Sequence, residues 1–341
     1  MIMIWFKFII CAGIIFFAGK RVAKYGDIIA EKTGLGGLWI GLVLVAVATS
    51  LPEIFTGVGS VVFVDAPDLT FGNLFGANTY NLLNLVLLDF LYRGSPLLSN
   101  VSSGQLLTGA LSLLPLLIAS SGIFLSQGFP GLCLANISLF SSLILIIYLI
   151  SVRIIFKFEQ RQQKILKELK KETEEVFKYG HISQSEAFAF FGFFASIIIG
   201  AGIWLAYLGE GLAGVLGWEK SFIGSLFLGF TTTLPEITVS VAALRLGAKE
   251  MAVANMLGSN LFNMTIIFIN DLLYRKAPIF LAVSSNHIFT SLVIIFMTVI
   301  VISAMILKPK KKMFLNLSGY AWGLIAMFII GAYVNFVLGT R

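Results

Sequence analysis

The stretch Ala48-Thr49-Ser50-Leu51-Pro52-Glu53 occurs a second time in the chain as Thr231-Thr232-Thr233-Leu234-Pro235-Glu236. A second pair of stretches follows at nearly the same offset, because Gly76-Ala77-Asn78-Thr79-Tyr80-Asn81 corresponds to Gly258-Ser259-Asn260-Leu261-Phe262-Asn263. Self-similarity at a fixed offset is the signature of a duplicated chain. The sequence therefore consists of two related halves.

The composition of both halves excludes a soluble globular protein. The chain of 341 residues is 58% hydrophobic and only 12% charged, against about 25% charged in soluble domains. Such a chain has too few polar residues to cover a surface that faces water. We therefore predict an all-α polytopic membrane protein. The two cysteines, Cys11 and Cys133, lie in apolar stretches and predict neither a disulfide framework nor a metal site.

Apolar stretches long enough to cross a bilayer divide the chain into ten predicted transmembrane helices, five in each half. Their predicted ranges are 4–23, 38–64, 70–92, 105–124, 131–152, 187–208, 222–244, 251–274, 279–307 and 315–338. Because each half has an odd number of helices, the second half enters the membrane from the opposite side, and the repeats are inverted. We predict a first repeat at 1–152, a connecting segment at 153–185 and a second repeat at 186–341.

The basic residues predict how the chain is oriented in the membrane. With the N-terminus outside, most of the 24 Lys and Arg residues fall in the segments after the first, third, fifth, seventh and ninth helices. Cytoplasmic loops of membrane proteins carry such an excess. We therefore expect both termini outside and the connecting segment in the cytoplasm, as a solvated or surface-lying helix. The net charge of +7 is then a topology signal, and no nucleic-acid partner is expected.

Two acidic residues, Glu53 and Glu236, lie deep in predicted helices near the middle of the bilayer. An ionised side chain is costly at this depth and usually marks a functional site. Pro52 and Pro235 precede them, and a proline lacks the N–H that its helix needs, so each helix should bend and expose backbone carbonyl oxygens. Inverted repeats with interrupted helices in matching positions are typical of secondary transporters, whose site lies near the midplane.

Neutral oxygen donors accompany the two carboxylates in both halves. They are Thr49, Ser50, Asn78 and Asn81 in the first half, and Thr232, Thr233, Ser259, Asn260 and Asn263 in the second. Two carboxylates among neutral oxygens predict a site for a hard cation such as Ca²⁺, which takes about six to eight oxygen ligands. The same oxygens, shared out, can hold Na⁺ ions, as competitive exchange requires. The expected partners are these transported inorganic cations and the lipid bilayer, with no cofactor; the oligomeric state stays open, a monomer included.

Two further features of the helices carry predictions. Gly76 and Gly258 should allow close backbone approach between helices. Asp89 and Asp271 each precede an arginine by four residues, which predicts local ion pairs with Arg93 and Arg275 at helix ends.

The two pairs of motifs make the sequence resemble the cation/calcium antiporter superfamily, specifically its sodium/calcium exchanger branch. That branch carries G-T-S-L-P-E and G-S-N-x-x-N/D signatures, which here begin at Ala48, Gly76, Thr231 and Gly258. The resemblance implies ten helices arranged five plus five, and export of Ca²⁺ driven by Na⁺ entry through alternating access, with the first and sixth helices as the sliding pair. It makes Glu53 and Glu236 the central carboxylates. It also implies that ion sites are lined by Thr49, Ser50, Asn81, Thr232, Thr233, Ser259 and Asn263.

The sequence departs from the family pattern at two informative positions. Ala77 replaces the usual serine and removes a hydroxyl that its counterpart Ser259 keeps. Asn263 is neutral where potassium-dependent members carry aspartate, which argues against potassium coupling. The large regulatory loop of animal exchangers is absent, which favours a compact protein of a bacterial inner (plasma) membrane.

Two other functions stay open at this point. The first is H⁺/Ca²⁺ or other divalent-cation antiport within the same superfamily. The second is a passive channel or a non-transporting membrane scaffold. No enzymatic activity is expected, because the sequence has no Ser/His pair, Asp dyad or His-rich metal motif.

Overall fold

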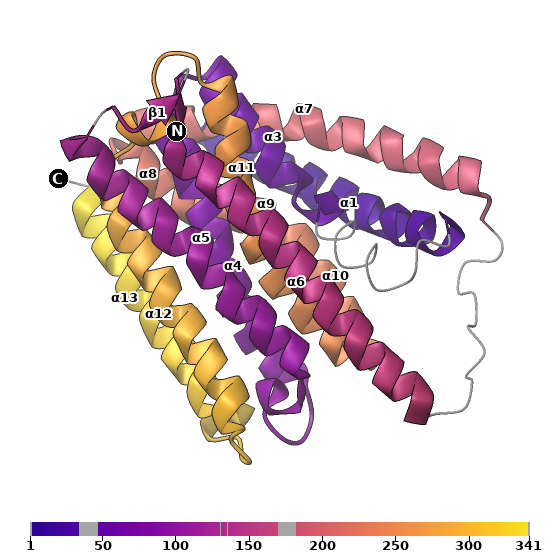
Figure 1. Cartoon of the computed structure of the whole chain (residues 1–341). Helices are drawn as coiled ribbons and strands as arrows, with labels where there is room; N and C mark the ends of the chain where they lie inside the picture. Colours follow the sequence, from indigo (N-terminus) through magenta and orange to yellow (C-terminus); the bar gives the residue numbers. More distant parts are fainter. Residues whose placement is uncertain (1, 34–46, 130, 135, 170–181, 340–341) are drawn as a thin grey trace.

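The structure is a computed structural model that describes residues 2–33, 47–129, 131–134, 136–169 and 182–339. The described chain is almost entirely helical (Figure 1). The elements of the first half are α1 (Ile2–Thr33), α3 (Leu51–Val58), the π-helical turn η1 (Gly59–Phe63), α4 (Pro67–Leu91), the 3₁₀ turn η2 (Leu97–Asn100), α5 (Ser103–Gly128), β1 (Cys133–Leu134), β2 (Ile137–Ser138) and α6 (Leu139–Leu169).

The second half follows a similar order. Its elements are α7 (Gln184–Leu216), α8 (Lys220–Ile223), the π-helical turn η3 (Gly224–Leu228), α9 (Gly229–Thr232), α10 (Leu234–Arg245), α11 (Lys249–Leu273), the 3₁₀ turn η4 (Ile279–Leu281), α12 (Asn286–Leu307), the 3₁₀ turn η5 (Phe314–Asn316) and α13 (Gly319–Gly339).

Eight helices within these ranges are long and apolar enough to cross a membrane. A ninth span is the bent pair Lys220–Thr232 and Leu234–Arg245, whose two parts meet at 41°. The span predicted at 38–64 is represented by the shorter apolar helix Leu51–Phe63, and residues 34–46 lie outside the described chain. The chain is thus an integral membrane protein of helical architecture, and the described part accounts for up to nine of the ten predicted spans.

The fifth predicted helix begins later and ends later than expected. The strands β1 (Cys133–Leu134) and β2 (Ile137–Ser138) pair antiparallel, and α6 begins only at Leu139. Asn136 has a φ of 66°, a left-handed conformation that asparagine tolerates in turns. At its other end α6 continues to Leu169, because the Lys, Glu and Gln residues beyond 152 are good helix formers. In the second half, the helix predicted at 279–307 is divided into η4 and α12.

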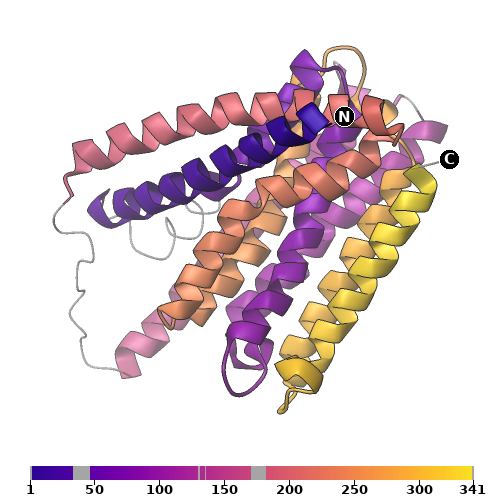
Figure 2. The ribbon, with the colours of Figure 1, turned by 180° about the vertical axis from the view of Figure 1, so that it is seen from behind.

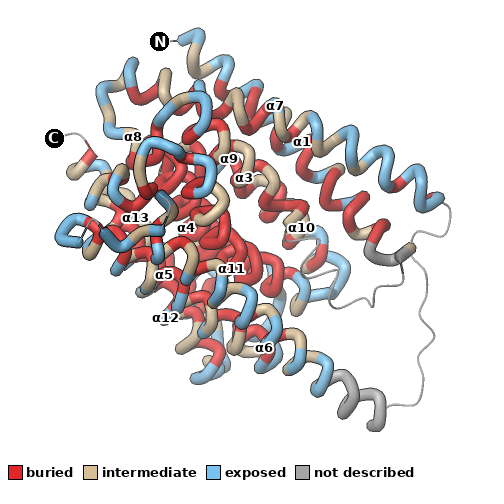
Figure 3. The backbone as a smooth tube through the Cα atoms, turned by 45° about the horizontal axis from the view of Figure 1, so that its top comes forward, coloured by how far each residue is buried: buried red, intermediate tan, exposed pale blue. Residues whose placement is uncertain are grey.

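Helices α4 and α11 form the buried centre of the molecule, with α5, α12 and α13 packed around them (Figure 3). Most residues of both central helices are buried, among them the asparagines of the repeated motifs. A water-facing or lipid-facing position for these polar side chains is thereby excluded. The repeated motifs therefore lie at the core of the fold.

Helices α1 and α7 lie side by side and extend away from this bundle (Figures 1 and 2). They reach α3 and α10 through glycines. A Cβ added to Gly19 would lie 2.3 Å from Cγ of Pro235, and one added to Gly202 would lie 2.9 Å from Cβ of Phe55. Gly19 and Gly202 are equivalent positions of the two halves, but their neighbours are not equivalent. Pro235 corresponds to Pro52, whereas Gly202 lies against Phe55, about one helical turn further along the chain.

Glycine also sets the close contact between α4 and the segment α8–η3–α9. A Cβ added to Gly76 would lie 2.2 Å from the backbone oxygen of Ser225, and one added to Gly229 would lie 2.7 Å from the backbone of Gly76. The prediction of close backbone approach is confirmed at Gly76. At Gly258, in contrast, no atom of the described residues lies within 4 Å of an added Cβ.

Replacing Gly76 with alanine should destabilise the protein by about 1 to 3 kcal/mol, because a backbone atom cannot move aside as a side chain can. Thermal unfolding in detergent measures the effect. Gly200→Ala is the matched control, since Gly200 is exposed on α7 and an added Cβ meets nothing described within 4 Å. Equal unfolding temperatures for the two variants would contradict the contact.

Candidate cation site

Both glutamates lie in the first turn of a helix that restarts after a break. In the first half the helix is interrupted at Ser50, and α3 then begins at Leu51 with Pro52 next. In the second half α9 ends at Thr232, and α10 begins at Leu234 with Pro235 next. The predicted interruption at each proline is confirmed. The N-terminus of each restarted helix carries partial positive charge, which favours a carboxylate in its first turn.

The two carboxylates approach each other in the interior. Glu53 and Glu236 are both fully buried, and they are close enough for their charges to interact. Hydroxyls of the opposite half accompany each one: Thr232 lies beside Glu53, while Thr49 and Ser50 lie beside Glu236. Ser50 Oγ donates to Glu236 Oε1 at 3.3 Å. Five of the predicted residues therefore meet at one place, with each half completing the surroundings of the other half's glutamate.

The four predicted asparagines form a symmetric bridge between α4 and α11. Asn78 Nδ2 donates to the carbonyl oxygen of Asn260 at 3.2 Å, and Asn260 Nδ2 donates to that of Asn78 at 3.1 Å. Asn81 Nδ2 donates to Asn260 Oδ1 at 3.0 Å, and Asn263 Nδ2 donates to Asn78 Oδ1 at 3.1 Å. Asn78 and Asn260 thus use both ends of their amides within the bridge. Asn81 and Asn263 use only their nitrogens.

This arrangement leaves a set of buried oxygens without hydrogen-bond partners in the described chain. They are both carboxylate oxygens of Glu53, Oε2 of Glu236, Oδ1 of Asn81, Oδ1 of Asn263 and Oγ of Ser259. An unpartnered buried oxygen costs about 1 to 3 kcal/mol or more. Six such atoms lie on the repeated motifs, and oxygen atoms are the ligands that hard cations take. Three of the six oxygens belong to carboxylates and three are neutral. Within the described ranges, three or more His, Cys, Asp or Glu side chains gather nowhere.

The remaining predicted residue, Thr233, behaves differently. Its hydroxyl donates to the backbone oxygens of Gly229 and Phe230, both at 3.0 Å. Its hydroxyl group therefore forms hydrogen bonds with carbonyl oxygens of α9, the helix that precedes it. The structure also brings in two residues that were not predicted as site residues, Asn73 and Asn255, which bond to the carbonyl oxygens of Glu53 and Glu236. Their equivalence in the two halves is the sequence signal that identifies them.

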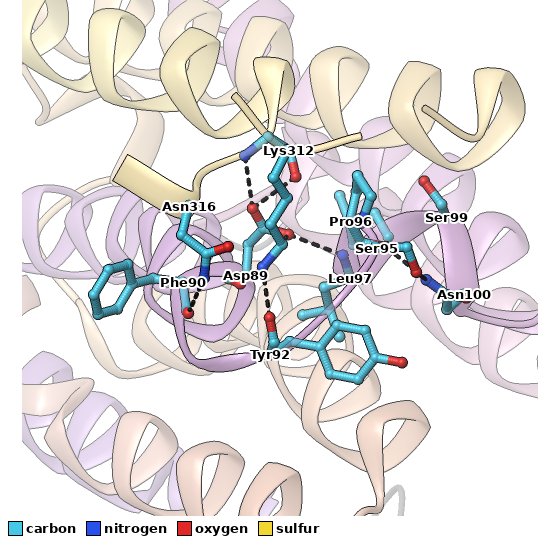
Figure 4. A network of polar contacts seen from close by, with 12 residues as sticks. Asp89, Phe90, Tyr92, Ser95, Pro96, Leu97, Ser99, Asn100, Lys312 and Asn316 are labelled. Carbon is cyan, nitrogen blue, oxygen red and sulfur yellow. Dashed lines mark hydrogen bonds and ion pairs between the residues drawn. The ribbon is translucent and has the colours of Figure 1, made fainter. Parts of the chain in front are cut away.

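Asp89 lies outside this site, and its predicted ion pair with Arg93 is wrong. The buried Asp89 carboxylate accepts from the amides of Leu97 and Ser318, at 2.8 and 2.9 Å, and from the hydroxyls of Ser318 and Tyr320, both at 2.7 Å. Its cation is Lys312, whose Nζ lies 3.9 Å from Oδ1 and also donates to the Asp89 carbonyl oxygen (Figure 4). Among the ion pairs of the described residues, none joins Asp89 to Arg93.

The equivalent ion pair predicted for Asp271 and Arg275 is wrong for the same reason. Asp271 accepts from the amides of Ser138 and Ile279, both at 2.7 Å, and from the hydroxyl of Ser141. The two aspartates therefore have equivalent structural roles. Each accepts hydrogen bonds from the turn that follows its helix, α4 or α11, and from a neighbouring element. The two cysteines form no disulfide, as expected.

Comparison with known proteins gives a match over nearly the whole chain. The family model described as "Sodium/calcium exchanger protein" matches residues 3–157 and 186–339. Inner membrane protein YrbG of Escherichia coli (strain K12) is 23% identical over 256 residues, which cover 74% of each chain. Sodium/potassium/calcium exchanger 2 of Homo sapiens is 28% identical over 132 residues, which cover 37% of this chain and 19% of the human protein.

Solved structures share the fold. A crystal structure of the H⁺/Ca²⁺ exchanger CAX superposes with a TM-score of 0.70 at 13% identity, over 99% of this chain and 85% of that one. The sodium-calcium exchanger NCX_Mj superposes with a TM-score of 0.57 at 20% identity, over 97% of this chain and 98% of that one. Both likenesses extend over the two halves and are likenesses of fold.

Proposed function

Because the chain belongs to the sodium/calcium exchanger protein family, we propose that it is a secondary antiporter, not an enzyme, which moves Ca²⁺ across the membrane in exchange for Na⁺. The observation that carries this proposal is the group of six unpartnered, buried oxygens on the repeated motifs. Their number is what Ca²⁺ coordination needs, and two carboxylates balance one divalent charge. Hydroxyl and amide oxygens are also ligands for Na⁺, so we expect the two ions to compete for one site.

Alternating access is supported by the unequal packing of α1 and α7. Gly19 faces Pro235 while the equivalent Gly202 faces Phe55. Two related halves that adopt different contacts provide two arrangements of similar energy, and their exchange would expose the site to the other side of the membrane.

We further propose ten transmembrane helices in two inverted repeats, 1–152 and 186–341, joined by the segment 153–185. Support comes from the two ends of the described chain, which lie at the same end of the molecule (Figure 1), as an even number of spans requires. The positive-inside rule then places both termini outside and the connecting segment in the cytoplasm. The bacterial relative is named as an inner membrane protein, which supports the same membrane for this chain.

A second candidate is exchange of Ca²⁺ for H⁺, and the interaction between the charges of the two buried glutamates favours it. Protonation of Glu53 and Glu236 would remove their mutual repulsion and give a return step without Na⁺. Potassium coupling is not part of the proposal, since Asn263 is neutral and its nitrogen is bonded to Asn78.

Uptake of ⁴⁵Ca²⁺ by proteoliposomes separates the two candidates. An outward Na⁺ gradient should drive Ca²⁺ uptake, while a pH gradient alone and added K⁺ should have no effect. Protein-free liposomes and vesicles treated with a Na⁺ ionophore give the background. Uptake that follows the pH gradient and ignores Na⁺ would replace the first candidate by the second, and uptake without any counter-ion gradient dependence would indicate a channel.

A further inference from the structure

Asn73 connects the interrupted helices of the two halves. Its Nδ2 donates to the carbonyl oxygen of Glu53 at 3.5 Å, and its Oδ1 accepts from the hydroxyl of Thr232 at 3.0 Å. Thr232 belongs to the second half and lies beside the Glu53 carboxylate. All three residues are fully buried. A single side chain on α4 therefore holds the end of α9 against the start of α3.

Asn255 is the equivalent residue on α11, and it makes only one half of this connection. Its Nδ2 donates to the carbonyl oxygen of Glu236 at 3.3 Å and to Ser240 Oγ at 3.0 Å. Its Oδ1 is buried and has no hydrogen-bond partner within the described ranges. Thr49, the equivalent of Thr232, lies beside Glu236. The asparagine and the threonine are thus present in both halves, but among the described residues the bond between asparagine Oδ1 and threonine is formed only at Asn73.

We propose that Asn73 and Asn255 are positioning residues that alternate during the transport cycle. The Asn73–Thr232 hydrogen bond stabilises the state described here, and a hydrogen bond between Asn255 and Thr49 replaces it in the opposite state. This inference rests on the proposed antiport by alternating access. It requires an element with two arrangements, which the interrupted helices provide, and a contact that differs between them. Exchange of one bond for its equivalent keeps the two states close in free energy, because one buried Oδ1 is satisfied in each.

The contacts of α1 and α7 support the same asymmetry from separate atoms. Gly19 lies against Pro235, which belongs to the second half, as does Thr232, the threonine bonded to Asn73. Gly202 lies against Phe55 in the first half, about one helical turn beyond the position equivalent to Pro235. The unequal bonding of the two asparagines thus accompanies unequal packing of the helices that contain the glutamates. Each asparagine bonds the backbone of a glutamate, and Asn73 also bonds Thr232, so both residues act on the site through the groups they hold.

The test is the ratio of the half-saturating Ca²⁺ concentrations at the two membrane faces, measured in vesicles of known orientation. Asn73→Ala and Asn255→Ala should shift this ratio in opposite directions by about fivefold, the effect of one hydrogen bond. The double variant should return the ratio close to that of the unmodified protein while slowing transport. A residue that only stabilises the fold would lower activity at both faces and leave the ratio unchanged.

Asn84→Ala is the control, since Asn84 is a buried asparagine on the same helix whose Nδ2 has no hydrogen-bond partner in the described chain. Its ratio should stay unchanged. Thr232→Val breaks the same bond from the donor side, and it serves in place of Asn73→Ala where that variant does not fold. Shifts of the two single variants in the same direction, or no shift, overturn the inference.

This outcome is separable from failure of the proposed function. The ratio is measured with whichever counter-ion, Na⁺ or H⁺, drives Ca²⁺ uptake by the unmodified protein. Normal transport with an unshifted ratio overturns the alternating bond alone. Absence of Ca²⁺ transport under either gradient overturns the proposed function, and the inference with it.

Discussion

Glu53→Gln and Glu236→Gln should each lower the rate of Ca²⁺ transport by about a hundredfold or more, while the protein still folds and inserts into the membrane. Glutamine has the shape of glutamate but removes one negative charge and replaces a ligand oxygen with an N–H₂ group that repels a cation. In the buried setting of these residues a charge of the opposite sign contributes several kcal/mol to cation binding. Proteoliposome ⁴⁵Ca²⁺ flux measures the loss, and gel filtration in detergent checks the fold.

Glu186→Gln is the matched control for this pair. Glu186 is an exposed glutamate in the first turn of α7, so it shares the chemistry and the place at a helix start but not the burial. Its flux should equal that of the unmodified protein. Flux at the unmodified level in either Glu53→Gln or Glu236→Gln would remove that residue from the cation site.

Asp89→Ala should give the largest loss of stability, about 3 to 5 kcal/mol. The substitution removes the acceptor of four hydrogen bonds and leaves the nearly buried Lys312 without its carboxylate. The four lost hydrogen bonds account for much of that cost, and the rest comes from Lys312, which keeps the carbonyl oxygens of Asp89 and Tyr92 but loses its carboxylate. Thermal unfolding of the purified protein in detergent gives the measurement.

Two comparisons identify the origin of the effect. The double variant Asp89→Ala with Lys312→Met should unfold at a higher temperature than Asp89→Ala alone, because it removes the stranded charge. Asp271→Ala should cost less than Asp89→Ala, because no lysine lies beside Asp271 among the ion pairs of the described residues. Identical stability of the single and double Asp89 variants would show that the lysine plays no part.

Sequence repetition predicted the parts of the site that depend on local chemistry. Pro52 and Pro235 interrupt their helices because a proline cannot donate a backbone hydrogen bond and its ring presses on the preceding turn. Glu53 and Glu236 lie in apolar stretches that cross the membrane, so their charged side chains are buried in the protein interior, away from lipid. The membrane class, the helical architecture and the family follow from the same observations.

Contacts between distant parts of the chain could not be predicted in this way. The asparagine bridge divides its members into two whose amide nitrogen and oxygen are both bonded within the bridge, Asn78 and Asn260, and two whose amide oxygens have no partner in the described chain, Asn81 and Asn263. All four have the same sequence signal, and only packing of α4 against α11 distinguishes them. The partner of Asp89 was predicted wrongly for a related reason. The sequence shows an arginine four residues away, but it does not show that the distant segment around Ser318 packs against Asp89.

The glycines of α1 and α7 place a limit on how the chain can diverge. Gly19 now fits against Pro235, and exchange of the two halves' arrangements would bring it against the position equivalent to Phe55, which is Thr238. Under the proposed alternating access, the residue at position 19 must therefore fit two different neighbours in turn, and the same requirement holds for Gly202. A side chain chosen to fill the space at one neighbour would block the other. Improved packing at these positions would stabilise one state and stop turnover, so a protein with a higher unfolding temperature would be the slower transporter.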